Sequence, residues 1–466
     1  MALAFKRFGF LASIASLTLL NACATVQLPN QFEGFYINNI PNSTEIHRAN
    51  YDLVFSLDFT NRYNLENKTK DFAIYGSGWL IDWKKPDKNK KNDPFRVYLA
   101  TNLHLGDNLQ TLGNYSPYNK LDPEYGVTKA FRLAKYTSVK DFVLPSQLGL
   151  PNDAKAFVTA QPTVLPKTAF TSRDFVDYSL PKDQVDKKEE LTDLHWVRGT
   201  KSNTTDSLSY ADFSVLEMPL FLDKTTDRKI FNHFIQPAIN TYKQLGDSLN
   251  IFANPTLDQL KQNRYYVLGY PNLRNSVRTL LVNQTKASIA AAKTIPQQTT
   301  QESKTEKPFV VGKSTVKPTL IRNKGDKFNG STVAWRYDHV AGFQFGQNFQ
   351  GRHYQQYGKG IVLNHAGFTG GVSGTVVLND LKKIAGIYFA THFTANGDWG
   401  VIQLLRWNAK NSSDETRSVA YDLIFGNSNT KHFYAQFAKQ QKTHLYEQIT
   451  KTRDPQFRFV EKAKKN

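Results

Sequence analysis

A serine lies between glycines in the stretch Gly370-Gly371-Val372-Ser373-Gly374, and a run of β-branched residues follows at once. Glycine permits a sharp backbone turn, so the hydroxyl of Ser373 can stand exposed instead of packing. The β-branched run predicts a strand that holds this turn in place. Such a turn can bring the amides of Gly371 and Ser373 together, as an oxyanion hole requires. An ordinary glycine-rich strand turn has the same pattern, so the rest of the chain must supply a histidine and a carboxylate in suitable settings.

A histidine and an aspartate with suitable settings occur earlier in the chain. His104 closes a strand predicted over 95–100, and Gly76-Ser77-Gly78 on the preceding strand allows a close approach beside it. Asp212 lies inside the buried-strand pattern of residues 210–220, where an unpaired carboxylate is costly. Taken singly, His104 also fits a structural histidine, and Asp212 also fits a carboxylate at a strand edge that reaches solvent.

Together the three residue types form a coherent chemical set. A serine hydroxyl is a poor nucleophile until a neighbouring imidazole accepts its proton. That imidazole must in turn be held in the correct tautomer by a buried carboxylate. We therefore predict that His104, Asp212 and Ser373 lie together in the folded chain.

Composition limits the other possibilities. The chain has 466 residues, 32 Phe and 22 Tyr, which suits a β-rich globular protein with two or three domains and polar loops. Its formal net charge of +19 would suit an acidic partner, but the basic residues are scattered and favour a solvated surface. A nuclease or nucleic-acid-binding protein is a weaker alternative, because the sequence shows no aromatic and basic stripe and no cluster of metal-binding carboxylates. We expect no nucleic-acid partner.

The single cysteine, Cys23, excludes a disulfide and a cysteine-based zinc site within one chain. It follows a basic start, an apolar run from Phe8 to Leu20 and a small residue, as at the end of a signal peptide. Leu20-Asn21-Ala22-Cys23 resembles a bacterial lipobox, in which diacylglycerol is attached to the thiol. An ordinary signal peptide followed by a chance cysteine is the alternative. We expect Cys23 to be lipidated and the protein to be anchored on the outer face of the cell membrane.

Motifs for metal and nucleotide binding are missing. The sequence contains no HExxH, no GxxxxGK[ST] and no GxGxxG. We therefore expect neither a metal nor a cofactor.

The pattern along the chain predicts a mainly β protein with added helices. Apolar residues recur at helical spacing after residue 223, and the polar composition near residue 300 cannot bury enough apolar surface to become ordered. The expected segments are a lipoprotein signal peptide (1–22), a tether (23–50), a first β-rich half (51–222) with an insertion (107–209), a helical bridge (223–262), a second β-rich half (263–429) with a disordered loop (283–318), and a helical basic tail (430–466).

The order of the motifs resembles that of chymotrypsin-like serine endopeptidases. Gly-Ser-Gly-x-Leu-Ile, Ala-Thr-Asn-x-His, Ala-Asp-Phe-Ser-Val-Leu and Gly-x-Ser-Gly follow one another as in that family, and the strand at 267–271 resembles the start of its second barrel. With the lipobox, the Lys/Asn/Phe-rich composition and the long insertions, the chain resembles mycoplasma surface lipoproteins of the immunoglobulin-specific serine endopeptidase family. The resemblance covers most of the mature chain, and it is loose at 107–209, at 283–318 and in the tail.

The resemblance implies a chymotrypsin-like double β-barrel, with barrels at 51–222 and 263–429. It implies a serine endopeptidase in which Ser373 attacks, His104 moves the proton and Asp212 orients His104. The amides of Gly371 and Ser373 would hold the oxyanion. In some members of the family the substrate is host immunoglobulin, held by a partner binding lipoprotein.

Two qualifications accompany the resemblance. Val372 stands where trypsin-type members carry an aspartate, so activation by a buried N-terminal amine is not expected. A fold does not guarantee chemistry, and a non-catalytic lipoprotein on the same scaffold, an adhesin or immunoglobulin binder, is the alternative.

Overall fold

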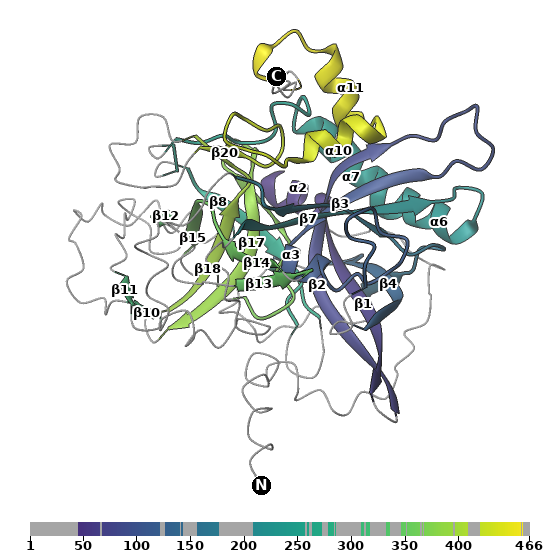
Figure 1. Ribbon diagram of the computed structural model, residues 1–466, viewed down its shortest axis with the longest axis horizontal. Helices are drawn as coiled ribbons and strands as arrows, with labels where there is room; N and C mark the ends of the chain where they lie inside the picture. The colour runs from purple at the N-terminus through teal and green to yellow at the C-terminus, as the bar shows by residue number, and fades with distance from the viewer. Residues whose placement is uncertain are drawn as a thin grey trace.

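The structure, a computed structural model, shows a mainly β chain with short helices (Figure 1). It describes residues 45–65, 68–121, 126–139, 141–142, 156–176, 208–256, 259–260, 263–272, 278–283, 285, 309–311, 314–316, 332–335, 346–350, 352–363, 366, 368–394, 397–408, 420–457 and 459. The signal peptide, Cys23 and most of the expected tether lie outside these residues, as does most of the expected loop at 283–318. Among the helices that are described, none is long and apolar enough to cross a membrane.

A nine-stranded sheet carries the first half of the chain. Its order is β13-β14-β7-β3-β2-β1-β4-β5, and β6 pairs with β7 outside this path. The strands are β1 (Val54–Leu65), β2 (Lys68–Lys84), β3 (Phe95–Thr101), β4 (Val127–Tyr136), β5 (Phe157–Ala160), β6 (Lys167–Arg173), β7 (Leu208–Leu220), β13 (Gly346–Phe349) and β14 (Arg352–Gln356). The antiparallel β3–β7 pair sets Thr101 opposite Ser214, so the end of β3 lies beside the middle of β7.

A seven-stranded sheet carries the second half, and Figure 1 shows it on the left of the first sheet. Its order is β12-β15-β18-β17-β16-β8-β9. The strands are β8 (Tyr265–Gly269), β9 (Leu281–Val282), β12 (Thr332–Trp335), β15 (Gly360–Leu363), β16 (Val376–Asn379), β17 (Ile384–Thr394) and β18 (Gly397–Leu404). The β-branched run after Ser373 forms β16. This strand is buried along its whole length and pairs antiparallel with β8 and β17.

Two further strand pairs are smaller. They are β10 (Phe309–Val311) with β11 (Ser314–Val316), and β19 (Arg406–Trp407) with β20 (Tyr421–Asp422).

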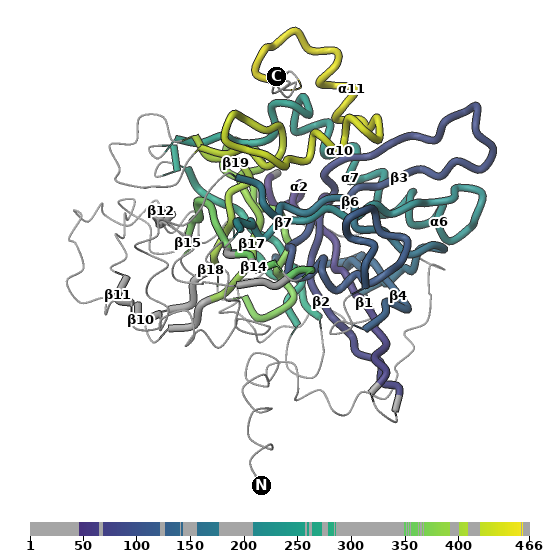
Figure 2. Tube along the Cα trace, viewed as in Figure 1, coloured from purple at the N-terminus to yellow at the C-terminus, as the bar shows by residue number. Residues whose placement is uncertain are grey.

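In the chain trace most helices lie in the upper part of the molecule, and one lies at the right beside the first sheet (Figure 2). The helices are α2 (Glu45–Leu53), α3 (Leu103–Gly106), α6 (Thr225–Ile230), the π-helix η4 (Phe231–Ile235), α7 (Gln236–Gln244), α10 (Tyr434–Gln441), α11 (His444–Lys451) and the 3-10 turn η6 (Pro455–Phe457). The side chain of Asp82 on β2 accepts hydrogen bonds from Tyr434 Oη (3.1 Å) and Leu445 N (3.0 Å), and so fixes α10 and α11 to the first sheet.

The described end of the expected tether is helical instead. Residues 45–50 begin α2, and this helix is bonded to both halves of the chain. Asn50 Nδ2 donates to Tyr266 O at 3.0 Å, and the buried Lys135 of β4 donates to the carbonyls of Tyr51 and Asp52 at 2.7 Å each. The polar composition suggested a tether because several buried residues of α2 are themselves polar and find their partners far away in the sequence.

The expected insertion also differs from the structure. Within 107–209, strands β4, β5 and β6 extend the nine-stranded sheet rather than forming loops. The β13–β14 hairpin lies in the expected second half, yet β14 pairs in parallel with β7, with Tyr354 opposite Leu208. Such a pairing over a long sequence separation leaves no local pattern.

Candidate active site

His104 lies in the single turn of α3, directly after β3. Asn102 is the N-cap with extended backbone, and Leu103, Leu105 and Gly106 are buried. The turn therefore buries its other three residues and points His104 outward, with 47% of its side chain exposed. The sequence placed this histidine at the end of the strand, and the structure places it three residues beyond the end of β3.

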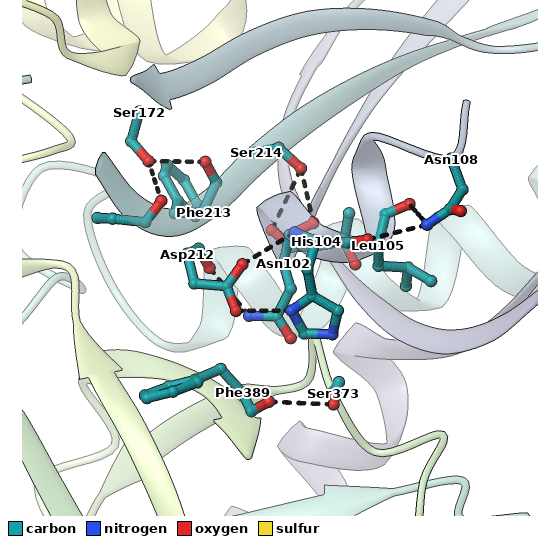
Figure 3. Close-up of polar contacts among 12 residues, drawn as sticks. Asn102, His104, Leu105, Asn108, Ser172, Asp212, Phe213, Ser214, Ser373 and Phe389 are labelled. Atoms are coloured by element: carbon teal, nitrogen blue, oxygen red, sulfur yellow. Dashed lines mark hydrogen bonds and ion pairs between the residues drawn. The ribbon is translucent and has the colours of Figure 1, made fainter. Parts of the chain in front are cut away.

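Asp212 on β7 binds His104 at two points (Figure 3). Its Oδ2 lies 2.7 Å from His104 Nδ1, and its Oδ1 accepts from His104 N at 3.0 Å. Only 5% of the Asp212 side chain is exposed. Because an ionised carboxylate only accepts hydrogen bonds, Nδ1 carries the proton and the neutral ring has a free lone pair on Nε2.

Further hydrogen bonds fix the turn that carries His104. Asn102 Nδ2 donates to the backbone oxygen of Asp212 at 2.9 Å, and Ser214 Oγ donates to Asn102 O at 3.0 Å. The segment after β3 is thus tied to the middle of β7 by side chains, while the ladder joins the two strands themselves. This holds the imidazole and the carboxylate in register.

The serine turn is docked against the first sheet. Ser77 Oγ donates to Gly371 O at 2.8 Å, and Ser77 N donates to Ser373 O at 2.7 Å. Gly371 and Gly374 have φ values of +109° and +96°, a region that favours glycine. A Cβ on Gly374 would clash with Ser77 O, so glycine is needed here for close approach as well.

Two amides of this turn stand apart from the others in their hydrogen bonding. The carbonyls of residues 370, 371 and 373 accept hydrogen bonds from Asn272 and Ser77. Within the described residues, the amides of Gly371 and Ser373 donate to no acceptor. Amides of this kind are suited to bind an anionic oxygen.

The hydroxyl of Ser373 donates to the carbonyl of Phe389 at 3.2 Å. Within the described residues, Ser373 Oγ makes no hydrogen bond to His104. In Figure 3, Ser373 lies on the side of the imidazole away from the Nδ1–Asp212 contact. The structure thus brings His104 and Asp212 into direct contact, and it leaves the hydroxyl bound to the neighbouring strand β17.

The charges around His104 favour its protonated form. Desolvation lowers the pKa of His104, but the charge and hydrogen bond of Asp212 and the charge of Asp107 outweigh it, so the pKa is raised above its usual value. Asp107 is itself paired with Arg173, whose Nη2 lies 2.5 Å from Asp107 Oδ2. Burial raises the pKa of Asp107 despite this partner.

Several residues around the site were not predicted from the sequence. Arg173 also lies over the ring of Phe349 at 3.9 Å, so the Asp107–Arg173 pair joins α3 to the β13–β14 hairpin. The small residues at 76–78 were the only feature of the sequence that indicated a close approach at Ser77. The described residues contain no group of three or more His, Cys, Asp or Glu placed to hold a metal.

A model of the family described as "Mycoplasma immunoglobulin protease" matches residues 44–390. The chain belongs to this family. The match covers the first sheet and the second sheet up to residue 390, and it includes His104, Asp212 and Ser373.

Relatives in the curated proteins carry lipoprotein names. An uncharacterized lipoprotein of Mycoplasma pneumoniae is 53% identical over 446 residues, covering 94% of this chain and 100% of the relative. An uncharacterized lipoprotein of Mycoplasma genitalium is 38% identical over 460 residues, covering 90% and 89%. This immunoglobulin protease family member therefore has full-length lipoprotein relatives in two mycoplasmas.

A solved structure described as that of the mycoplasma MIB and MIP proteins has a TM-score of 0.48 and 16% identity to this chain. The alignment covers 84% of this chain and 63% of that one.

Proposed function

We propose that the protein is a lipid-anchored serine endopeptidase of the mycoplasma cell surface, with a chymotrypsin-like double β-barrel scaffold. The observation that carries the proposal is the double contact between Asp212 and His104, at 2.7 Å to the ring and 3.0 Å to the backbone. A carboxylate that fixes both the position and the tautomer of an exposed histidine is what a general base requires.

The reaction assigns one role to each residue. Ser373 Oγ leaves the carbonyl of Phe389 and attacks the scissile carbonyl, while His104 Nε2 takes the hydroxyl proton. Asp212 stabilises the imidazolium, and the amides of Gly371 and Ser373 hold the oxyanion. His104 then gives the proton to the leaving amine, and a water molecule releases the acyl group from Ser373 by the reverse route.

The family and the sequence support the proposed anchor and the proposed substrate. Cys23 would carry diacylglycerol, which places the enzyme on the outer face of the cell membrane, and the lipoprotein names of the relatives support this. The family description supports a host protein as substrate, with immunoglobulin as the first candidate, presented by a binding lipoprotein.

One observation favours a second function. Because Ser373 donates to Phe389 O rather than to His104, the chain also fits a non-catalytic lipoprotein that binds host protein on a protease scaffold. Catalytic hydrogen bonds are often formed only when substrate is present, so this contact is compatible with either function.

Wild type and Ser373→Ala, each incubated with immunoglobulin G and with unfolded casein, test the proposal. Wild type is expected to cleave at least one of them and to react with a fluorophosphonate at Ser373, as mapped by mass spectrometry. Ser373→Ala should lose both properties, whereas Ser248→Ala, a buried serine bonded to His444, should keep both. Cleavage that persists in Ser373→Ala would overturn the proposal, and binding without cleavage or labelling would establish the second function.

A further inference from the structure

Tyr388 on β17 is fixed directly beside the serine turn. Its carbonyl accepts from Gly374 N at 2.8 Å, and its amide donates to Thr375 O at 3.0 Å. The carbonyl of the next residue along the strand, Phe389, accepts a hydrogen bond from the hydroxyl of Ser373. The side chain of Tyr388 therefore has a defined position relative to the nucleophile.

The Tyr388 side chain spans the space behind this turn. Its hydroxyl donates to Ala366 O at 2.8 Å and lies 2.6 Å from Thr391 Oγ1. The ring of Phe368 meets it edge-on with centroids 5.5 Å apart, and only 1% of Tyr388 is exposed. The ring thus reaches from β17 to the chain between β15 and the serine turn.

Gly400 on β18 provides the room for this ring. Gly400 lies opposite Thr391 in the β17–β18 pair, and a Cβ on Gly400 would clash with the ring of Tyr388. The missing side chain at position 400 leaves a space in the second sheet beside the reaction centre. The ring of Tyr388 occupies that space.

The same space is where a substrate side chain would go. In the proposed reaction the attacked carbonyl lies on Ser373 Oγ with its oxygen at the amides of Gly371 and Ser373. Since Ser373 Oγ lies 3.2 Å from Phe389 O, the residue that owns this carbonyl would lie between the serine turn and β17. Its side chain would then compete for the space that the ring of Tyr388 fills.

We propose that Tyr388 is the specificity-determining residue and that the enzyme cleaves after residues with small side chains, namely glycine, alanine and serine. The inference rests on the proposed function above. A larger side chain would have to displace a buried ring whose hydroxyl is hydrogen-bonded to Ala366 O and Thr391 Oγ1, which is unfavourable. Differences of one or a few methylene groups against a filled site change rates by tenfold or more.

The test uses the full-length lipoprotein in detergent and a set of quenched fluorescent peptides that differ only in the residue before the cleaved bond. Wild type is expected to favour alanine over phenylalanine in kcat/KM by about tenfold or more. Tyr388→Ala, which empties the space, is expected to reduce or reverse this ratio. Tyr388→Phe keeps the ring but removes both hydrogen bonds of the hydroxyl, so it is expected to keep a preference for alanine that is smaller than that of wild type.

The wild-type profile decides the inference even if Tyr388→Ala does not fold. Equal or faster cleavage after phenylalanine, leucine or lysine by wild type overturns it. Fluorophosphonate labelling of Ser373 separates a failure of the specificity inference from a failure of the proposed function. Labelling with no preference for small residues overturns the specificity alone. Absence of both labelling and cleavage overturns the proposed function and the inference with it.

Discussion

Ser77 Oγ donates a 2.8 Å hydrogen bond to the carbonyl oxygen of Gly371, a contact between residues 294 positions apart. It joins the strand that lies beside β3 to the loop that carries Ser373. The amide of Ser77 adds a second bond, to Ser373 O at 2.7 Å. The position of the candidate nucleophile relative to the histidine thus depends on one small residue of the first sheet.

Replacing Ser77 by alanine should lower both stability and activity. The buried carbonyl of Gly371 loses its partner, which costs about 1–3 kcal/mol of unfolding free energy. The loop should also lose its precise position, and kcat should fall by about 10–100-fold. Urea unfolding and peptide hydrolysis measure the two effects. Ser248→Ala removes a buried serine hydroxyl far from the site, so it should change stability alone; equal loss of kcat in both variants would contradict the role of Ser77.

Two glycines of the serine turn should respond differently to alanine. Gly374→Ala places a Cβ against Ser77 O and Thr101 Oγ1 at φ +96°, so the serine turn must shift and activity should fall by about 100-fold or more. Gly370→Ala meets nothing within 4 Å and should keep nearly full activity. Rates for the two purified variants check the prediction. A fully active Gly374→Ala would mean that the docked position of the turn is unimportant.

Activity should be lost at acidic pH. His104 must be neutral to accept the proton of Ser373, and its pKa is raised mainly by Asp212, so kcat/KM should fall below a pH that lies above the usual histidine value of about 6.5. The same shift stabilises the folded state below the unfolded pKa, and this contribution is lost as pH rises through the folded pKa. A pH–rate profile and an NMR titration of His104 in Ser373→Ala should give the same raised value. A titration at or below 6.5 would contradict the assignment.

Removing the charge of Asp212 should lower the pKa of His104. Asp212→Asn takes away the charge that raises the pKa of His104 and the acceptor that fixes its tautomer. The NMR pKa should therefore fall, and kcat should drop by about 10⁴-fold. Asp71→Asn alters an exposed carboxylate paired with Arg62 and should leave both quantities unchanged. An unchanged pKa in Asp212→Asn would argue against the contact in solution.

The Asp107–Arg173 pair should contribute to stability beyond what a surface pair does. Arg173→Met leaves the buried Asp107 without its charged partner, and the expected loss is about 3–5 kcal/mol. Arg62→Met breaks the exposed pair with Asp71, whose charges are screened by water, and should cost much less than Arg173→Met. Chemical unfolding of both variants tests the difference. Similar losses would show that the pair is more open to water than the structure indicates.

The sequence predicted the parts of the fold that have local patterns. The strand at 95–100, the buried strand at 210–220 and the strand after Ser373 correspond to β3, β7 and β16, because each combines apolar or β-branched residues with clear ends. The contact between His104 and Asp212 was expected from the cost of burying an unpaired carboxylate.

The remaining features depend on distant partners and could not be predicted. The buried Lys135 reads as a surface residue until α2 supplies two carbonyls for it. Tyr388 reads as an ordinary core residue until Gly400 and Ala366 are seen beside its ring. The hydrogen bond of Ser373 to Phe389 depends on how β17 lies against the turn, and no motif encodes that arrangement.

The parallel pairing of β14 with β7 also bears on how the chain assembles. Tyr354 lies opposite Leu208, only four residues before Asp212, so the strand that carries the carboxylate acquires its outer neighbour from a segment made nearly 150 residues later. A chain is made from its N-terminal end. The part of the sheet next to the His104–Asp212 pair is therefore completed only after β8, β9 and β12 of the second sheet have been made, and a chain that ends before β14 lacks it.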